Sequence, residues 1–219
     1  MVTEMAKTAV KPRLRGVIHT YGAMGAVLAG IPLVTAGFLH AAGAGVALLV
    51  YALTVFGVFG VSATYHRGPW SDGVRIWMKR ADHCMIFIFI AGSYTPIAVL
   101  ALPHGVGRTV LVVTWAGAVA GVALKLFWPH APRWVGVPLY IALGWVVVAV
   151  AGDLVRGAGW PAAVLLLIGG VLYSGGAVLY ATRWPNPWPR VFGHHEFFHA
   201  ATVIAAACHY AAMWLVLLH

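Results

Sequence analysis

Acidic residues are almost absent from this sequence. Charged residues of both signs make up 9% of the 219 residues, whereas hydrophobic residues make up 62%. A soluble domain carries about 25% charged residues and could not bury so much apolar surface. This balance excludes a soluble globular domain and predicts an integral membrane protein. The five acids of the chain are Glu4, Asp72, Asp82, Asp153 and Glu196.

Cysteine is equally scarce. Cys84 and Cys208 both lie within apolar segments, which is typical of small buried side chains and does not indicate a disulfide framework. The net charge of +9 reflects the shortage of acids, and the basic residues lie in short loops instead of on one face. We therefore expect no nucleic-acid partner, and the charge instead indicates how the chain is oriented in a bilayer.

Long apolar runs, by contrast, recur along the whole chain. Each is near the roughly 20 residues that a helix needs to cross a bilayer. Short segments rich in Gly, Pro and charge separate them, such as "RGPWSDG" and "RWPNPWPRVFG". The fold class predicted is an all-α, seven-transmembrane helix bundle: a short basic tail, 1–16, and one membrane domain, 17–219. The predicted spans are 17–39, 44–66, 81–102, 107–127, 134–152, 160–181 and 195–218.

The distribution of basic residues predicts the orientation. With seven spans, 12 of the 14 Lys and Arg residues fall on the side of the N-terminus, and only Arg108 and Arg156 fall on the other. The positive-inside rule then places the N-terminus in the cytoplasm and the C-terminus outside. We expect a multi-pass protein of the cell membrane. The 12 residues are Lys7, Lys11, Arg13, Arg15, Arg67, Arg75, Lys79, Arg80, Lys125, Arg133, Arg183 and Arg190.

Polar side chains from three of these spans are expected at one membrane level. Ser62 and His66 are four residues apart near the end of the second span, and therefore share a helix face. Asp82 is expected in the first turn of the third span. His195 and His199, again four apart, begin the seventh. All three helix ends lie on the cytoplasmic side of the predicted topology, and ionisable residues within a membrane are functional candidates by default.

Three imidazoles at one level predict a zinc site. Catalytic zinc takes three protein ligands and leaves one position open for water. His66, His195 and His199 would be the ligands, and Asp82 would hold or deprotonate the water. Ser62, one turn deeper than His66, would hydrogen-bond that water or Asp82. The other histidines are not expected to bind the metal. His209 lies too deep in the membrane to reach the three ligands and is expected to make a buried hydrogen bond, whereas His19 could line the cavity without being required there. The histidines expected at the membrane interface are His40, His104, His130 and His219.

The pentapeptide HEFFH, residues 195–199, fits the zinc-peptidase signature HExxH. The longer form of that motif needs Gly and then His downstream, where this chain has Thr202 and Ala205. No carboxylate follows Glu196 either, so a further ligand must come from upstream, as His66 does. Glu196 also lies about 100° around the helix from His195, and we expect it to face lipid headgroups or a basic residue of a loop. The peptidase interpretation is therefore disfavoured.

The ordered combination of "SATYH", "DHCMIFIFIAGSYTP" and "HHEFFH" resembles the haemolysin III family. That family is the bacterial branch of the progestin and adiponectin receptor proteins, in a wider group that includes alkaline ceramidases. The resemblance extends over nearly the whole chain. It implies a seven-helix bundle with zinc at the cytoplasmic side on His66, His195 and His199, and with Ser62 and Asp82 at the positions that hold the water.

Three functions are consistent with these features. The leading hypothesis is a zinc-dependent hydrolase of an amide or ester lipid, with the acyl chain in the bundle cavity and Asp82 as base. The second is a non-enzymatic sensor or regulator of membrane lipid with structural zinc. The third is a haemolysin-like channel or pore, which is less favoured because the polar residues cluster at one end and form no stripe along a helix.

Overall fold

The chain forms a bundle of helices. The computed structural model describes residues 12–128 and 130–219, and within them every regular element is a helix. Lys7, Lys11 and most of the predicted 1–16 tail lie outside the described residues. The elements are α1 (Val17–His40), α2 (Ala42–Arg67), α3 (Asp72–Leu100), α4 (His104–Phe127), α5 (Arg133–Gly144), the 3-10 helix η1 (Trp145–Val150), α6 (Ala151–Thr182) and α7 (His194–Leu218).

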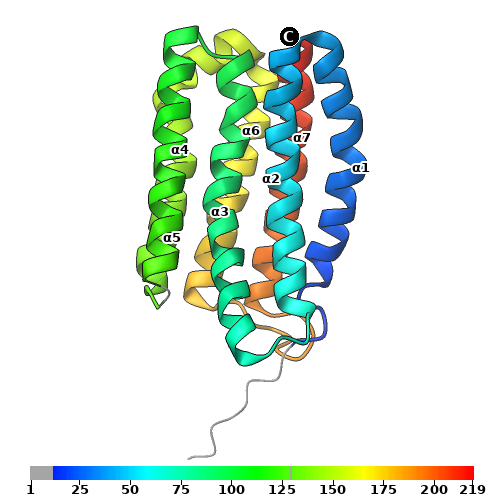
Figure 1. Ribbon diagram of the computed structural model, residues 1–219, viewed down its shortest axis with the longest axis vertical. Coiled ribbons are helices and arrows are strands. Elements are labelled where there is room, and N and C mark those ends of the chain that lie inside the picture. The colour runs from blue at the N-terminus through cyan, green and yellow to red at the C-terminus, as the bar shows by residue number, and fades with distance from the viewer. Residues whose placement is uncertain (1–11, 129) are drawn as a thin grey trace, which may run out of the picture.

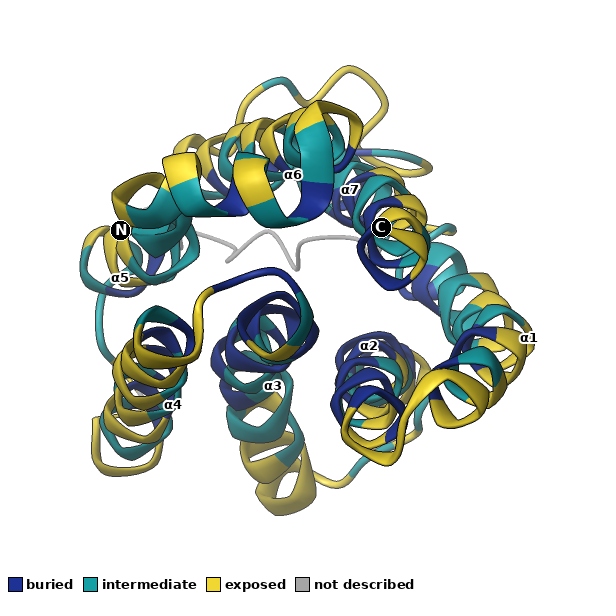
Figure 2. Cartoon of the chain, turned by 90° about the horizontal axis from the view of Figure 1, so that it is seen from above, coloured by how far each residue is buried: buried dark blue, intermediate teal, exposed yellow. Residues whose placement is uncertain are grey.

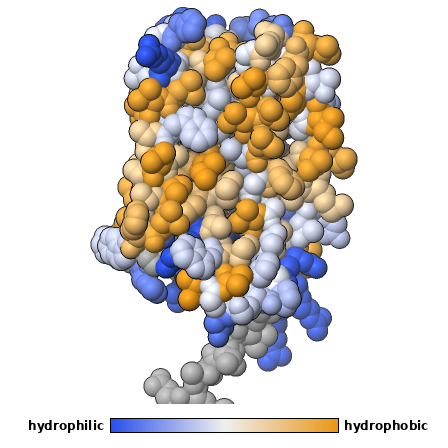
Figure 3. Space-filling model, viewed as in Figure 1, coloured by the Kyte–Doolittle hydropathy of each residue, from blue (hydrophilic) through white to orange (hydrophobic). Residues whose placement is uncertain are grey.

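The helices follow one another around a ring in chain order (Figures 1 and 2). The closest neighbours are α1 with α2, α2 with α3, α3 with α4, and α6 with α7; α1 also contacts α7. Large apolar side chains such as Leu28, Ile31, Val112 and Val119 lie on the outside, and the apolar band covers the middle of the molecule (Figure 3). Six stretches in the described part of the chain are long and apolar enough to cross a membrane. The predicted all-helical, multi-pass architecture is confirmed at this level.

Helix α3 begins nine residues earlier than predicted, at Asp72 instead of residue 81. The expectation that Asp82 lies in the first turn is therefore wrong, because it lies almost three turns in. The charged stretch 72–80 was interpreted as a loop, yet it alternates basic residues with exposed apolar ones such as Ile76 and Trp77. Arg80 lies over the Trp77 ring, with its guanidinium carbon 4.5 Å from the ring centroid. An interfacial helix can carry such charges, so the composition did not reveal the helix start.

The stretch Arg133–Thr182 is 50 residues long and would extend about 75 Å if it were one straight helix. Its backbone leaves the helical conformation at Gly159, with φ 76° and ψ 163°. Only glycine adopts this backbone conformation readily, and Pro161 lies two residues further on. The expected loop "GDLVRGAGW" is otherwise helical, so its predicted extent is wrong. Figure 1 shows α5 starting at the lower end and the first part of α6 at the upper end.

A second irregularity separates α5 from α6. The hydroxyl of Tyr94 in α3 donates to the carbonyl oxygen of Gly144 at 2.6 Å and accepts the backbone N–H of Val147 at 2.9 Å. One side chain thus satisfies two backbone groups where the α-helix gives way to η1. Because unpaired backbone groups are costly within a bilayer, Tyr94 stabilises this break and fixes the position of α5 against α3.

Candidate metal centre and its cavity

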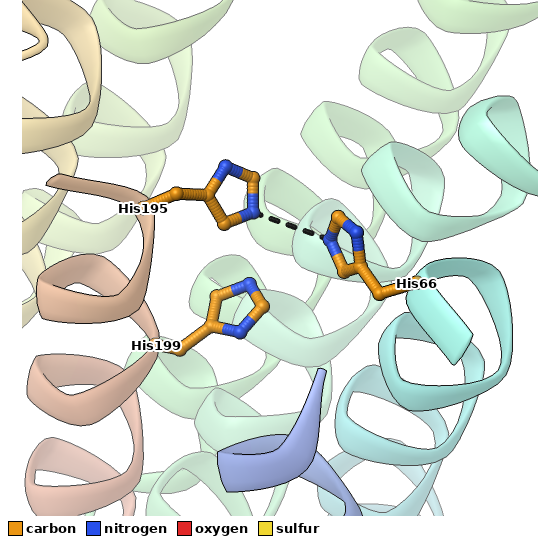
Figure 4. A group of neighbouring side chains, drawn as sticks. All are labelled: His66, His195 and His199. Carbon is orange, nitrogen blue, oxygen red and sulfur yellow. Dashed lines mark hydrogen bonds between the residues drawn. The ribbon is translucent and has the colours of Figure 1, made fainter. Parts of the chain in front are cut away.

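His66, His195 and His199 converge at one end of the bundle (Figure 4). His66 lies in the last turn of α2, and the other two lie one turn apart at the start of α7. One ring nitrogen of each lies within 4.8 Å of the other two, and Nε2 of His66 is 3.2 Å from Nε2 of His195. The structure therefore brings together the three histidines that the sequence singled out as ligands.

The donor set fits a metal ion. Two nitrogens bound to one tetrahedral zinc at about 2.0–2.1 Å lie about 3.3 Å apart, close to the observed His66–His195 separation. Nδ1 of His199 is buried and has no hydrogen-bond partner in the described part of the chain. A modest shift of the third ring would complete a three-imidazole site. A group of this kind could hold a metal ion.

Asp82 and Ser62 line the same cavity as the three histidines. The Ser62 hydroxyl of α2 lies close enough to the Asp82 carboxyl group of α3 to interact with it. Ser62 is buried one turn from His66, as the spacing in the sequence predicted. The Asp82 carboxylate is outside the group of three possible ligands.

His19 of α1 adds a fourth imidazole to this end. Its ring stacks on that of His199, with centroids 3.7 Å apart and planes inclined by 10°, and it is buried. From the sequence, His19 was only a residue that could line the cavity. No spacing could identify it, because its partner lies 180 residues away on another helix. It fixes the plane of the His199 ring from the side of α1.

The segment before α1 closes this end of the bundle. Backbone N–H groups of Arg13 and Leu14 donate to the carbonyl oxygens of Arg190 and Val191, at 3.0 and 3.3 Å. Gly16 has φ 80°, and a Cβ at this position would lie 2.8 Å from Cβ of His66. A side chain at residue 16 would therefore collide with the proposed ligand, so glycine allows the segment to pass directly beside the site.

Glu196 has a structural role here. Its side chain is completely buried, forms an ion pair with Arg15, and accepts the N–H of Gly193 at 2.9 Å as part of a capping box. The expectation that it faces lipid headgroups is wrong, whereas the alternative of a basic partner is confirmed, although that partner lies before α1 and not in a loop. A carboxylate that is engaged in this way is not free to be the base of a peptidase.

A cavity of about 1060 Å³ runs from the histidines along the inside of the bundle. Arg15 lines one end, Arg156 and Trp160 line the other, and apolar side chains such as Ile97 and Leu166 line the middle. Its volume is at the upper limit of ordinary small-molecule sites, and its wall is suited to an apolar chain.

His209 lies apart from the cluster, as predicted. Its Nε2 donates to the backbone carbonyl of Leu166 at 3.3 Å. His83, next to Asp82 in α3, also lines the cavity, and its Nδ1 donates to the carbonyl oxygen of Lys79 at 2.6 Å.

The fold and the site define a class: an all-helical, multi-pass membrane protein with a histidine cluster at one end of an internal cavity. The family model described as "Haemolysin-III related" matches residues 7–210, and the chain belongs to this family. The resemblance to the haemolysin III branch of the progestin and adiponectin receptor proteins is thereby confirmed.

Individual relatives agree with this assignment. The chain is similar to "Hemolysin-3" of Bacillus cereus, at 30% identity over 82% of this chain and 80% of the relative. It is similar to "Hemolysin-3 homolog" of Bacillus subtilis (strain 168), at 29% identity over 80% and 81%. The human "Monocyte to macrophage differentiation factor" is 23% identical over 75% of this chain and 68% of that protein.

Proposed function

We propose that this protein is a zinc-dependent hydrolase of an amide or ester lipid. The observation that carries the proposal is that Asp82, Ser62 and three convergent imidazoles line one large, mainly apolar cavity. Zinc at His66, His195 and His199 would polarise a carbonyl and lower the pKa of water at its open position. The site residues and the metal are both part of this proposal.

The side chains of the chain itself would do the proton transfers. Asp82 takes a proton from the attacking water, whose oxygen forms the new bond to the carbonyl carbon. The C–N or C–O bond of the lipid then breaks, and Asp82 returns the proton to the leaving nitrogen or oxygen. Ser62, which lies near Asp82, would donate a hydrogen bond to the carboxylate and keep it directed at the reacting atoms. Atoms and charge balance without any further co-reactant.

The substrate would lie with its acyl chain in the cavity and its carbonyl at the histidines. We propose that the stretch Arg133–Thr182 crosses the membrane twice, which gives seven spans with the N-terminus in the cytoplasm. The change of backbone direction at Gly159 and the predominance of basic residues at the histidine end support this topology. The site then lies on the cytoplasmic side of the cell membrane, at the level of lipid headgroups.

A lipid sensor with structural zinc is the second candidate. The observation that favours it is the closure of the site by the segment around Arg15, which is anchored to buried Glu196. A site built only to fix helices would need the three histidines but would tolerate the loss of the Asp82 charge. A pore is supported less, because apolar side chains such as Ile97 and Leu166 interrupt the polar groups along the wall.

The variant Asp82→Asn separates hydrolase from sensor. We expect it to retain its metal and its fold and to lose hydrolysis by at least ~100-fold, because the asparagine amide cannot accept a proton from water. Release of fatty acid from a panel of N-acyl and O-acyl lipids is measured by mass spectrometry. Asp72→Asn, an exposed acid of the same helix, is the matched control and should keep full turnover. Unchanged turnover in Asp82→Asn would eliminate the hydrolase proposal.

A further inference from the structure

A second polar group lies deep in the cavity, away from the histidine cluster. The Tyr173 hydroxyl of α6 and Nδ1 of His209 in α7 are buried atoms without a hydrogen-bond partner in the described part of the chain. Both residues line the cavity, and their rings meet edge to face with centroids 5.3 Å apart. A third such hydroxyl, on Tyr51, lies in the core cluster against which Tyr173 packs. Unpartnered polar atoms are costly in a bilayer, so their retention indicates a function.

The backbone makes room for this group. A Cβ at Gly169 would lie 2.3 Å from Cδ2 and 2.5 Å from Nε2 of His209. The imidazole therefore occupies space that any other residue at 169 would fill. This contact and the hydrogen bond to Leu166 hold the His209 ring in one orientation, in which Nδ1 has no hydrogen-bond partner in the described part of the chain.

The hydrogen-bonding pattern identifies the chemistry of a ligand. A carbonyl oxygen only accepts, so Nε2 of His209 carries the hydrogen that points to Leu166, and Nδ1 of the neutral ring is an acceptor. The Tyr173 hydroxyl offers a donor. An alcohol group can donate to Nδ1 and accept from Tyr173 at once, whereas a ketone or ester can satisfy only the tyrosine, and an alkyl chain satisfies neither.

We propose that Tyr173 and His209 form a subsite for a hydroxyl group carried on the hydrocarbon chain of the bound lipid. His209 lies ten residues beyond His199 on α7, or about 15 Å deeper. A C–C bond of about 1.5 Å advances an extended chain by roughly 1.25 Å per carbon, so the hydroxyl lies about 12 carbons from the carboxyl carbon. The ligand class is thus a long-chain acyl lipid hydroxylated near the middle of its chain. This rests on the lipid cavity of the proposed function but needs neither metal nor hydrolysis.

Binding of three fatty acids to the detergent-purified protein tests the subsite. By isothermal titration calorimetry we expect 12-hydroxystearic acid to bind about tenfold tighter than stearic acid or 2-hydroxystearic acid, since its hydroxyl alone reaches the deep pair. In Tyr173→Phe, which removes one oxygen, the preference should fall below about twofold, while stearic acid binds as before. Tyr210→Phe, on the residue next to His209 but outside the cavity lining, is the control and should retain the preference.

Each other outcome overturns the proposal in a distinguishable way. Equal affinity for all three fatty acids in the wild type leaves the lipid cavity intact and eliminates the hydroxyl subsite. An equal gain from either hydroxyl position, or a preference that survives Tyr173→Phe, places the hydroxyl elsewhere. If none of the three binds, the lipid cavity itself is wrong, and the proposed function falls with it.

Discussion

The two ends of the bundle contain the same kinds of residue in different arrangements. At one end, His19, His66, His195 and His199 face one another, and the ion pair Arg15–Glu196 has a completely buried carboxylate. At the other end, His40, His104 and His219 are exposed singly, and in the ion pair Asp153–Arg156 the arginine side chain is 75% exposed. The presence of histidines and of an ion pair does not by itself distinguish the ends. Convergence and burial do, and they are the reason why we propose the functional site at the end of the bundle that contains the histidine cluster.

The largest expected difference between the ends is in metal content. His199→Ala should reduce zinc from about one per chain to background, because two imidazoles hold the ion far more weakly than three. Elemental mass spectrometry on detergent-purified protein measures this. His40→Ala, at the other end, should keep the wild-type content. A wild type that is free of metal after chelator-free purification would contradict the zinc site, and the cluster would then be polar packing.

The second largest expected difference is in how much each of the two ion pairs contributes to stability. Glu196→Gln leaves Arg15 facing a neutral, buried amide, and we expect a loss of about 3 kcal/mol in stability. Asp153→Asn at the exposed pair should cost less than about 0.5 kcal/mol. Thermal unfolding in detergent compares the two variants. The double variant Arg15→Met/Glu196→Gln should recover much of the loss, since no unpaired charge remains. Equal effects of the two single variants would mean that burial does not separate these pairs.

The smallest expected effect concerns the deep polar group of Tyr173 and His209. Gly169→Ala puts a methyl group into the space of the His209 ring and should cost about 1–2 kcal/mol through the displaced imidazole. Gly170→Ala is the matched control, because a Cβ at that position meets only Trp145, at 4.0 Å. It should be neutral or slightly stabilising, since alanine is the better helix former. If both variants unfold at the same temperature, Gly169 does not hold His209 in place.

Sequence patterns were sufficient for what is periodic or local. Apolar runs predicted the helices, and i, i+4 spacing predicted which pairs, Ser62 with His66 and His195 with His199, share a face. The start of α3 was missed because an interfacial helix tolerates charges that resemble a loop. The stacking of His19 on His199 and the identity of Arg15 as the partner of Glu196 were missed, because partners 180 and 181 residues apart on separate segments leave no spacing in the sequence.

The sequence by itself determined that this is a multi-pass helical membrane protein with histidines concentrated at one membrane level, since hydrophobicity and helix period are properties of consecutive residues. Only the tertiary structure decided which of those histidines converge, that Glu196 is a buried anchor and not a catalytic base, and that Tyr173 and His209 meet deep in the cavity. These depend on the rotation and depth of each helix against its neighbours, which side-chain packing sets and which no single segment encodes.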